Sequence, residues 1–432
     1  MNLKLTKKNE MNSFFSNYRT FTRPISKIIL LVFWNKTILI TVLFFTISSC
    51  TFSINIIEKV LNNSDPSIQK IIKNAEVHEI QILLTEVVKD AKGIPTFLET
   101  EYNVNENKYF YPASTVKLPI AILTLQKIKE LNAQGIPINS TTAFEVRDQI
   151  GRLVIRSDST EEMGKVTLAH LIKKVFLVSD NEAYNYLFDF LGRDYIYREL
   201  QKKGLSSAQI QYKFLEGADN TNTWEYTFFD EVGAIVYHQE SLTATLVLSP
   251  PKLEGILKGN GFISNGELVK KPMDFNKKNA LSIRDLDGIL KRLIFPELFP
   301  KIAQFDLQPA DYTFLKYWMS RSTLESEFPN YNDQEYWDSY GKFLIYGDQK
   351  GVMNNGLRSY NKVGYAFGTL TDVAYIQDRR NDLEFFLTAT ILVNENKIFN
   401  DNVYEFESKG IPFLAALGRG ILKEFQEKKK GL

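Results

Sequence analysis

Two polar side chains stand at the start of an apolar stretch with a spacing that lets them act on each other. Ser114 and Lys117 are three residues apart, so on a helix they share one face. If the start of that helix is buried, desolvation lowers the pKa of the lysine, and its neutral amine can accept the serine proton. A helix N-terminus also favours the negative charge that develops during acyl transfer. The pair is therefore a candidate nucleophile and base.

The Ser-x-x-Lys spacing is weak support on its own, because it recurs at Ser67–Lys70. That copy follows a proline and is expected to lie in the exposed first turn of a short helix. Ser114 instead precedes residues 114–131, where apolar residues lie on most sides of a helix and predict that it is buried. The burial that lowers a lysine pKa is therefore expected at Lys117.

Two further motifs offer polar groups for the same chemistry. Ser179-Asp-Asn181 lies between two predicted helices, where Ser179 could relay a proton to a leaving nitrogen and Asn181 could donate to a substrate carbonyl. These residue types also cap helices, and capping is an alternative that is compatible with chemistry. Lys362-Val-Gly364 begins a predicted strand, where Lys362 would bring positive charge and Gly364 would let a substrate lie against the strand.

The elements that must position these motifs follow a simple order. Strands are expected over residues 78–88 and 96–104, helices over 114–131, 167–177, 181–191 and 193–203, strands over 361–366, 372–377 and 383–393, and a last helix over 411–428. Strands from both chain ends are expected to form one antiparallel sheet packed against the helical middle. The predicted fold class is α+β, with the active site between sheet and helices.

With its motifs in this order, the sequence resembles the class A β-lactamase and penicillin-binding protein family of serine hydrolases, whose motifs are S-x-x-K, S-D-N and K-T-G. The resemblance covers about residue 67 to the C-terminus, and residues 362–376 resemble a lipoprotein branch of Bacteroidetes type. It implies a β-lactamase/transpeptidase-like fold, with Ser114 acylated and Lys117 as a candidate base. It also implies an oxyanion hole made by the backbone N–H groups of Ser114 and Tyr365, beside Ser179, Asn181, Lys362 and Gly364.

The third motif departs from the family pattern, because Val363 stands where the family has threonine. Valine has a similar shape but no hydroxyl, so one donor to a substrate carboxylate is missing, at a cost of about 1.5–3 kcal/mol. This loss predicts weak β-lactam affinity or a different natural substrate.

The acid that would activate a deacylating water is a second departure. In the β-lactamases it belongs to a Glu-x-x-Leu-Asn loop, and here Glu216 lies 35 residues after Asn181, with Asn220 at the matching offset but Asp219 in place of leucine. Glu216 is either this base or an ordinary solvated loop acid. As the base, it would make the protein a β-lactamase. Without it, slow release would make the protein a penicillin-binding protein or a D,D-peptidase.

The distance between the second and third motifs predicts an insertion within about residues 219–351. Its aromatic segments, such as 224–229 and 312–318, are expected to be packing rather than a binding surface. Three functions are considered: hydrolysis of a β-lactam, D,D-peptidase action on a cell-wall peptide, and a non-catalytic surface lipoprotein with the same fold. The intact motifs favour the two enzymes, and the first over the second. No cofactor is implied.

Residues 1–49 are expected to be a lipoprotein signal peptide. A basic leader precedes an apolar stretch ending in Ile47-Ser-Ser-Cys50, which resembles a bacterial lipobox. Cys50 would be lipidated, residues 50–66 would form a tether, and the protein would be exported and membrane-anchored on the periplasmic or cell-surface side. A spanning anchor is the alternative, which Lys36 disfavours, because a lysine inside a membrane span costs about 2.5–3.5 kcal/mol.

Composition narrows the remaining functions. The net charge is +1 and acidic and basic residues are mixed, which is not typical of a nucleic-acid-binding protein. The 3 histidines and the single cysteine show no metal-ligand spacing, so no metal site is predicted.

Overall fold

The fold is known from a computed structural model that describes residues 55–332 and 334–431. The predicted signal peptide and Cys50 lie outside the described residues. Among the helices that are described, none is long and apolar enough to cross a membrane.

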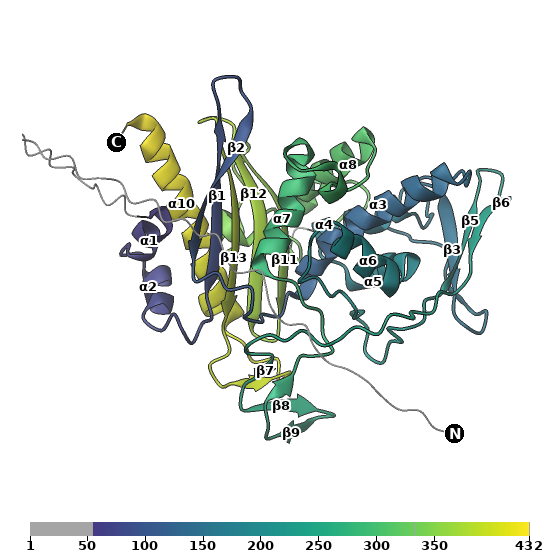
Figure 1. The fold of residues 1–432 in the computed structure, drawn as a ribbon, viewed down its shortest axis with the longest axis horizontal. Coiled ribbons are helices and arrows are strands. Elements are labelled where there is room, and N and C mark those ends of the chain that lie inside the picture. Colours follow the sequence, from purple (N-terminus) through teal and green to yellow (C-terminus); the bar gives the residue numbers. More distant parts are fainter. Residues whose placement is uncertain (1–54, 333, 432) are drawn as a thin grey trace, which may run out of the picture. The chain divides into compact units, whose positions relative to one another are not determined.

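A five-stranded antiparallel sheet, built from both ends of the chain, organises the fold (Figure 1). Its strands are β1 (Gln81–Lys89), β2 (Pro95–Tyr102), β11 (Leu357–Ala366), β12 (Thr369–Asp378) and β13 (Leu383–Leu392), in the order β11-β12-β13-β1-β2. The two halves of the chain meet where β13 pairs with β1, with Leu387 opposite Leu84. The predicted α+β fold, with one sheet formed from both chain ends, is confirmed. The third motif lies on β11, at the edge of this sheet.

One face of the sheet is covered by α10 (Ile411–Lys430), and α1 (Ile56–Leu61) and α2 (Pro66–Ile72) pack beside that helix (Figure 1). The buried side chains of α1 belong to the same core cluster as those of α10 and the sheet. The prediction that residues 50–66 form a tether is therefore wrong from Ile56 onward. Asn55 caps α1 by accepting from Ile57 N at 2.8 Å, and burial of Ile57, Val60 and Leu61 holds the helix in place.

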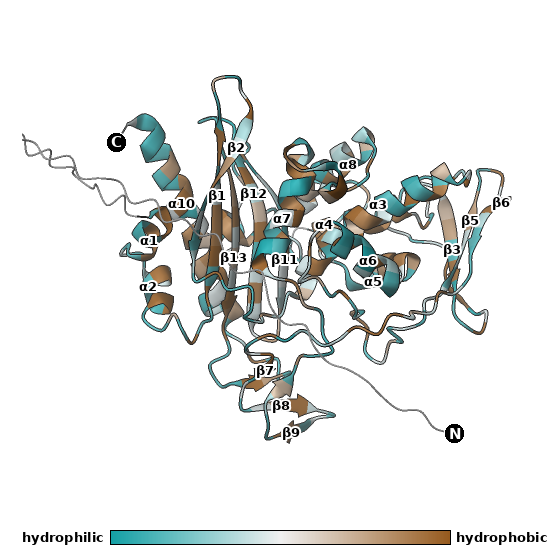
Figure 2. Ribbon diagram, in the orientation of Figure 1, coloured by the Kyte–Doolittle hydropathy of each residue, from teal (hydrophilic) through white to brown (hydrophobic). Residues whose placement is uncertain are grey.

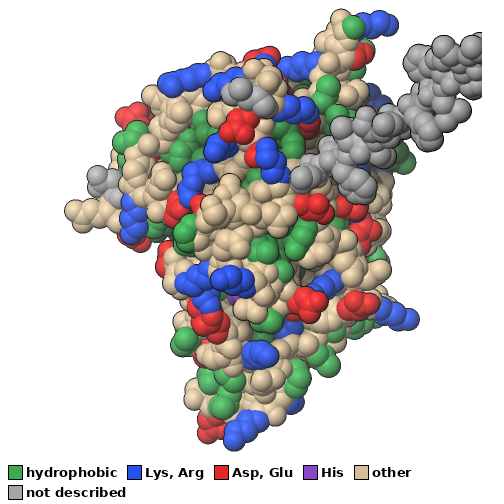
Figure 3. All heavy atoms as spheres, turned by 90° about the vertical axis from the view of Figure 1, so that its left-hand side faces the viewer, with side chains coloured by type: hydrophobic (Ala, Val, Ile, Leu, Met, Phe, Trp, Pro, Cys, Tyr) green, Lys and Arg blue, Asp and Glu red, His purple; other side chains and the backbone are tan. Residues whose placement is uncertain are grey.

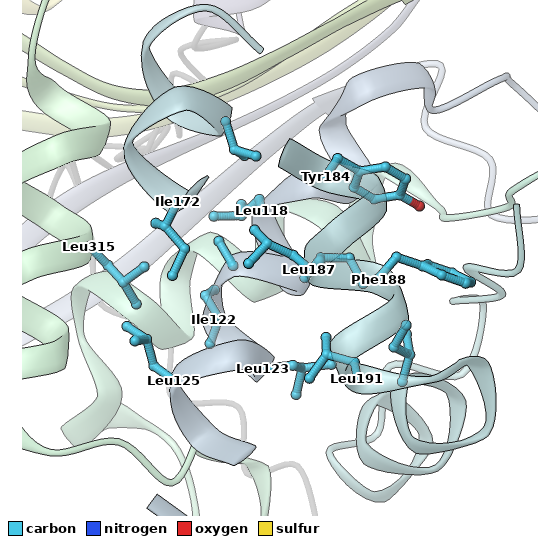
Figure 4. Packing of buried hydrophobic residues seen from close by; sticks show 14 of the residues in the cluster. Leu118, Ile122, Leu123, Leu125, Ile172, Tyr184, Leu187, Phe188, Leu191 and Leu315 are labelled. Atoms are coloured by element: carbon cyan, nitrogen blue, oxygen red, sulfur yellow. The ribbon is translucent and has the colours of Figure 1, made fainter. Parts of the chain in front are cut away.

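On the opposite side, α7 (Ile283–Ile294) packs against β1, β12 and β13, and α8 (Pro309–Ser320) packs against β11. The other helices from the middle of the chain form a group next to α8, in which α3 packs against the rest; these are α3 (Lys117–Ala133), α4 (Leu168–Leu177), α5 (Asn181–Leu191) and α6 (Arg193–Lys202). α3 is buried along most of its length, as its sequence predicts. Figure 4 shows the core around it, with Leu118, Ile122 and Leu125 of α3 beside Ile172 of α4, Leu187 of α5 and Leu315 of α8. Each such side chain contributes about 1.5–3 kcal/mol through burial.

Smaller elements complete the described fold. A four-stranded sheet of order β4-β3-β5-β6 contains β3 (Ala143–Arg147), β4 (Leu153–Ile155), β5 (Glu225–Phe229) and β6 (Ile235–Gln239). Short strands are β7 (Leu257–Lys258), β8 (Gly261–Ser264), β9 (Glu267–Val269), β10 (Met273–Asp274) and β14 (Ile398–Phe399). Single helical turns are η1 (Ala113–Val116), η2 (Pro296–Leu298), η3 (Lys301–Ala303), η4 (Thr323–Glu325), α9 (Phe343–Tyr346) and η5 (Phe406–Gly410).

Brown, apolar residues in Figure 2 follow the central strands and the inner sides of the helices, while teal residues mark the outward sides. On the face drawn in Figure 3, basic and acidic side chains are interspersed. The segments between α6 and β11 are spread over the molecule as α7, α8 and several short strands, so the chain expected to form an insertion contributes directly to the helical layer.

Candidate active site

Ser114 lies in the short turn η1, which runs directly into α3. Its side chain is half-buried, whereas its neighbours Ala113 and Thr115 are buried. Ala113 has a φ of +45°, a left-handed conformation that costs a non-glycine residue about 1–3 kcal/mol. The surrounding packing therefore holds the turn in a strained shape, in which Ser114 keeps part of its surface exposed.

Lys117 is fully buried behind this turn and its ammonium group is held by the second motif. Nζ donates to Asn181 Oδ1 at 2.6 Å and to Ser179 Oγ at 3.3 Å, and also to the backbone carbonyl of Ser179. The rings of Phe214 and Tyr184 lie 5.1 and 5.8 Å from Nζ. Burial, reinforced by the nearby Lys362 ammonium, holds the pKa of Lys117 well below its usual range. Within the described residues, no hydrogen bond joins Lys117 Nζ to Ser114 Oγ.

The hydroxyl of Ser179 lies between two lysines. It accepts from Lys362 Nζ at 2.8 Å in addition to Lys117 Nζ. Ser179 itself has a φ of +58°, a second left-handed non-glycine residue at this site. Asp180 caps α5 by accepting from Ala183 N at 2.8 Å, so the capping interpretation of this motif holds alongside its place in the site.

A buried polar network supports Lys362 from the sheet side. Asp372 on β12 is fully buried and accepts from Asn361 Nδ2 at 2.9 Å and from Leu344 N at 3.1 Å. Lys342 Nζ donates to Asn361 Oδ1 at 2.8 Å. Burial raises the pKa of Asp372 to about 6 and lowers the pKa of Lys342 to about 8. Burial also lowers the pKa of Lys362 to about 7, and the carboxylate of Asp372 opposes that shift.

Gly364 lets the edge strand β11 touch the nucleophile turn. A Cβ placed on Gly364 would lie 2.6 Å from Pro112 O, 2.7 Å from Thr115 N and 2.8 Å from Ser114 N. Any side chain here would therefore push the strand away from η1. Because β11 is an edge strand, some of its N–H groups have no sheet partner. The structure thus brings the backbone around Tyr365 next to that of Ser114, where the oxyanion hole is expected.

A cavity of about 60 Å³ lies beside Ser179, Lys362 and Tyr365, and some of its other lining residues were not predicted from the sequence. Ser179, Lys362 and Val363 line one side, and Trp337 and Tyr340 line another. The prediction that aromatic residues of the insertion serve as packing stays a prediction for these two, which also contact each other. It holds for the aromatic side chains that lie in or against the main core, namely Trp224, Tyr226, Phe228, Tyr312, Phe314 and Trp318, whereas Tyr317 is 45% exposed. Only the local richness in aromatic residues between 331 and 346 could have drawn attention to this wall.

Glu216 forms no contact with the site residues among the hydrogen bonds and ion pairs of the described chain. Its side chain is exposed in the turn after Phe214, and no hydrogen bond or ion pair joins it to another described residue. Phe214 is the residue of this segment that lies beside Lys117, because Phe214 N donates to Asn185 Oδ1 at 2.8 Å and fixes the chain there. Asn220 also faces elsewhere, accepting from Lys213 N at 2.7 Å. Its exposure favours the second of the two interpretations of Glu216, an ordinary solvated loop acid, and its role as a base stays a prediction.

The other Ser-x-x-Lys copy behaves as expected. Ser67 lies in the first turn of α2, and Lys70 is exposed, with its ammonium on the backbone carbonyl of Ser408. The remaining predicted site residues, Ser114, Lys117, Ser179, Asn181, Lys362, Gly364 and Tyr365, come together around one end of β11. Among the described residues, no group of His, Cys, Asp and Glu side chains is arranged to hold a metal ion.

A comparison with protein families gives this arrangement its context. The model described as "Beta-lactamase enzyme family" matches residues 65–425, which is most of the chain. The chain belongs to this β-lactamase family. The match spans all three motifs, together with the strands from both chain ends.

No curated protein sequence matches the chain. Among solved structures, a β-lactamase from Xanthomonas campestris is similar at 15% identity and a TM-score of 0.47, covering 85% of this chain and 97% of that one. A class A β-lactamase from Mycobacterium abscessus is 14% identical with a TM-score of 0.45, over 83% of this chain and 99% of that one. A mutant of PBP-A in an acyl-enzyme complex with penicillin G is 12% identical with a TM-score of 0.46, over 86% and 96%.

Proposed function

We propose that this β-lactamase-family protein is a serine hydrolase that opens an amide bond of a β-lactam or a cell-wall peptide by forming an acyl-enzyme at Ser114. The observation that carries the proposal is the hydroxyl of Ser179 held between two buried lysines beside a reachable serine. A non-catalytic binding module has no need of two buried ammonium groups, each of which costs free energy to desolvate.

The proposed reaction gives each polar group of the site a role. Neutral Lys117 takes the proton of Ser114, whose Oγ attacks the amide carbonyl carbon. Backbone N–H groups of Ser114 and Tyr365 stabilise the oxyanion that forms. The C–N bond then breaks, and the leaving nitrogen receives a proton from Ser179, which is resupplied from the lysine ammonium groups on either side of its hydroxyl. Water later releases the acyl group as a carboxylic acid.

We further propose that this release is slow, so that the protein behaves as a penicillin-binding protein or D,D-peptidase toward β-lactams rather than as a rapid β-lactamase. The support is that the segment carrying Glu216 places the ring of Phe214 5.1 Å from Lys117 Nζ, while Glu216 itself is exposed. An aromatic ring cannot take a proton from water. Val363, buried and without a hydroxyl, also favours a substrate other than a classical penicillin.

The purified protein, treated with a fluorescent penicillin and a chromogenic cephalosporin, tests both parts. We expect a stable covalent label that Ser114→Ala abolishes, and slow cephalosporin turnover that Glu216→Gln leaves unchanged. Labelling that survives in Ser114→Ala would exclude this nucleophile. A drop in turnover of tenfold or more in Glu216→Gln would return that residue to the mechanism.

Export as a lipoprotein anchored through Cys50 belongs to the same proposal. Its support is the basic and apolar leader that ends in Ile47-Ser-Ser-Cys50. Expressed in bacteria with labelled palmitate, the protein should take up the label, and Cys50→Ala should not. Equal uptake by both would contradict lipidation at this position.

A further inference from the structure

A groove of about 610 Å³ opens near the start of β11, at the end of the strand that does not carry Gly364. Its floor is formed by two rows of side chains across the sheet. Arg358 pairs with Gln377, which pairs with Glu384, and Tyr360 pairs with Tyr375 in the next row. The volume is that of a small-molecule site. None of the proposed catalytic groups lines it.

One face of α8 forms a wall of this groove. Thr313, Lys316, Tyr317 and Ser320 are spaced three or four residues apart, so their side chains lie along the same side of the helix. Two hydroxyl groups and a cation thus face the same space as the amide of Gln377. Tyr317 is 45% exposed, and because the guanidinium of Arg321 lies 4.0 Å from its ring centre, a ligand would contact the remaining exposed surface of the ring.

The groove carries an excess of positive charge. Five cations line it, namely Lys89, Lys316, Arg321, Arg358 and Arg379. Only two carboxylates balance them: Glu384 pairs with Lys89, and Glu325 pairs with both Arg321 and Arg358. Lys316 and Arg379 form no ion pair with any described residue. Arg379 donates instead to the neutral Gln377 Oε1, at 3.1 Å.

Two further features of this surface favour an added hydrogen-bond acceptor. Arg321 Nε is buried without a hydrogen-bond partner, although its guanidinium is held 4.0 Å from the centre of the Tyr317 ring. A buried donor without a partner is costly, and an acceptor brought by a ligand would satisfy it. Burial also lowers the pKa of Lys316, and an anion bound beside it would raise that pKa again.

We propose that this groove binds an anionic saccharide. The carboxylate or phosphate of the ligand pairs with Lys316 and Arg379, a sugar ring lies on Tyr317, and its hydroxyls bond to Thr313, Ser320 and Gln377. Charge and ring recognition are both required, because the cations select an anion and the exposed aromatic face selects a ring. The site is separate from Ser114 and does not depend on acylation there.

Calorimetric titration of the full chain carrying Ser114→Ala tests the proposal without covalent chemistry. The probes are N-acetylmuramic acid, N-acetylglucosamine 1-phosphate, neutral N-acetylglucosamine and inorganic phosphate. We expect at least one anionic sugar to bind at least tenfold more tightly than both the neutral sugar and inorganic phosphate. The two anionic sugars distinguish a carboxylate from a phosphate ligand.

Lys316→Ala combined with Arg379→Ala should weaken that binding at least tenfold, whereas Lys423→Ala, an exposed lysine on α10, should not change it. If the neutral sugar binds as tightly as the anionic sugars, the cations of the groove do not select the ligand. If binding survives the double substitution, the ligand does not bind in this groove. Either result would contradict the proposed site. If inorganic phosphate binds as tightly as the sugar phosphate, the sugar ring is not recognised, and the saccharide part of the proposal is wrong. Thermal melting of each variant establishes that it is folded.

Discussion

Replacing Lys117 by methionine is expected to slow acylation of Ser114 about 10³-fold, the scale of general-base catalysis. Methionine fills a similar apolar volume but has no amine to accept the serine proton. The substitution also removes the donor to Asn181 Oδ1 and Ser179 O, so some loss of stability is expected. The measurement is the rate of labelling with a fluorescent penicillin, alongside a thermal melt. A rate within tenfold of the unaltered protein would exclude Lys117 as the base.

The pH dependence of the same rate separates the two lysines. Acylation needs neutral Lys117 and protonated Lys362, so the rate should rise as Lys117 loses its proton and fall as Lys362 does, near pH 7. Asp372 raises the pKa of Lys362, so Asp372→Asn should move the falling limb to lower pH. Asp378→Asn, on the same strand, should leave the profile in place. A falling limb that stays fixed in Asp372→Asn would disconnect this carboxylate from Lys362.

Gly364→Ala is expected to reduce acylation about 10²-fold, the scale of a displacement near 1 Å at a reacting centre. The added methyl group meets three backbone atoms within 2.8 Å, and backbone cannot swing aside as a flexible side chain can. Strand and turn must therefore separate, which moves the N–H groups of the oxyanion hole apart. Overpacking of this kind also costs about 1–3 kcal/mol of stability.

Gly351→Ala is the matched control, because a Cβ there meets no atom within 4 Å. It should change neither the labelling rate nor the melting temperature. If Gly364→Ala melts lower but labels at an unchanged rate, the contact is structural and the N–H groups beside it do not serve acylation.

The main elements of the fold were predictable because their patterns are long. The strands that became β1, β2, β12 and β13 and the helices α3 to α6 have an apolar periodicity that decides their type. The four-stranded sheet was not predictable, since β3 and β5 are five residues each and come from segments 77 residues apart. Only their pairing buries Phe144 and Phe228, so neither segment signals a strand by itself.

The site, too, was predictable only in part from the sequence. The three motifs identified Ser114, Ser179 and Lys362, although the Ser-x-x-Lys spacing also occurs at Ser339–Lys342 and Ser359–Lys362, which shows how little that spacing means without its surroundings. Counting residues offered Glu216 as a candidate base, but an offset does not say whether a side chain points inward, and this one is exposed. The contacts of Asp372, Lys342 and Trp337 depend on chain segments meeting in space, which no local pattern records.

The side chain of Lys342 ties three separate pieces of the chain together. Its ammonium group donates to Met319 O at the end of α8, at 2.7 Å, and to Ser359 O and Asn361 Oδ1 on β11, at 3.1 and 2.8 Å. The carboxylate of Asp372 draws on the same segment through Leu344 N. A descendant that lost residues 321–351 would lose the Leu344 N–H that donates to the buried Asp372 and the Lys342 ammonium that donates to Asn361 Oδ1. Residues 321–351 and the edge strand β11 therefore depend on each other for buried hydrogen bonds. Replacing one of them with the matching part of a shorter protein would require replacing the other as well.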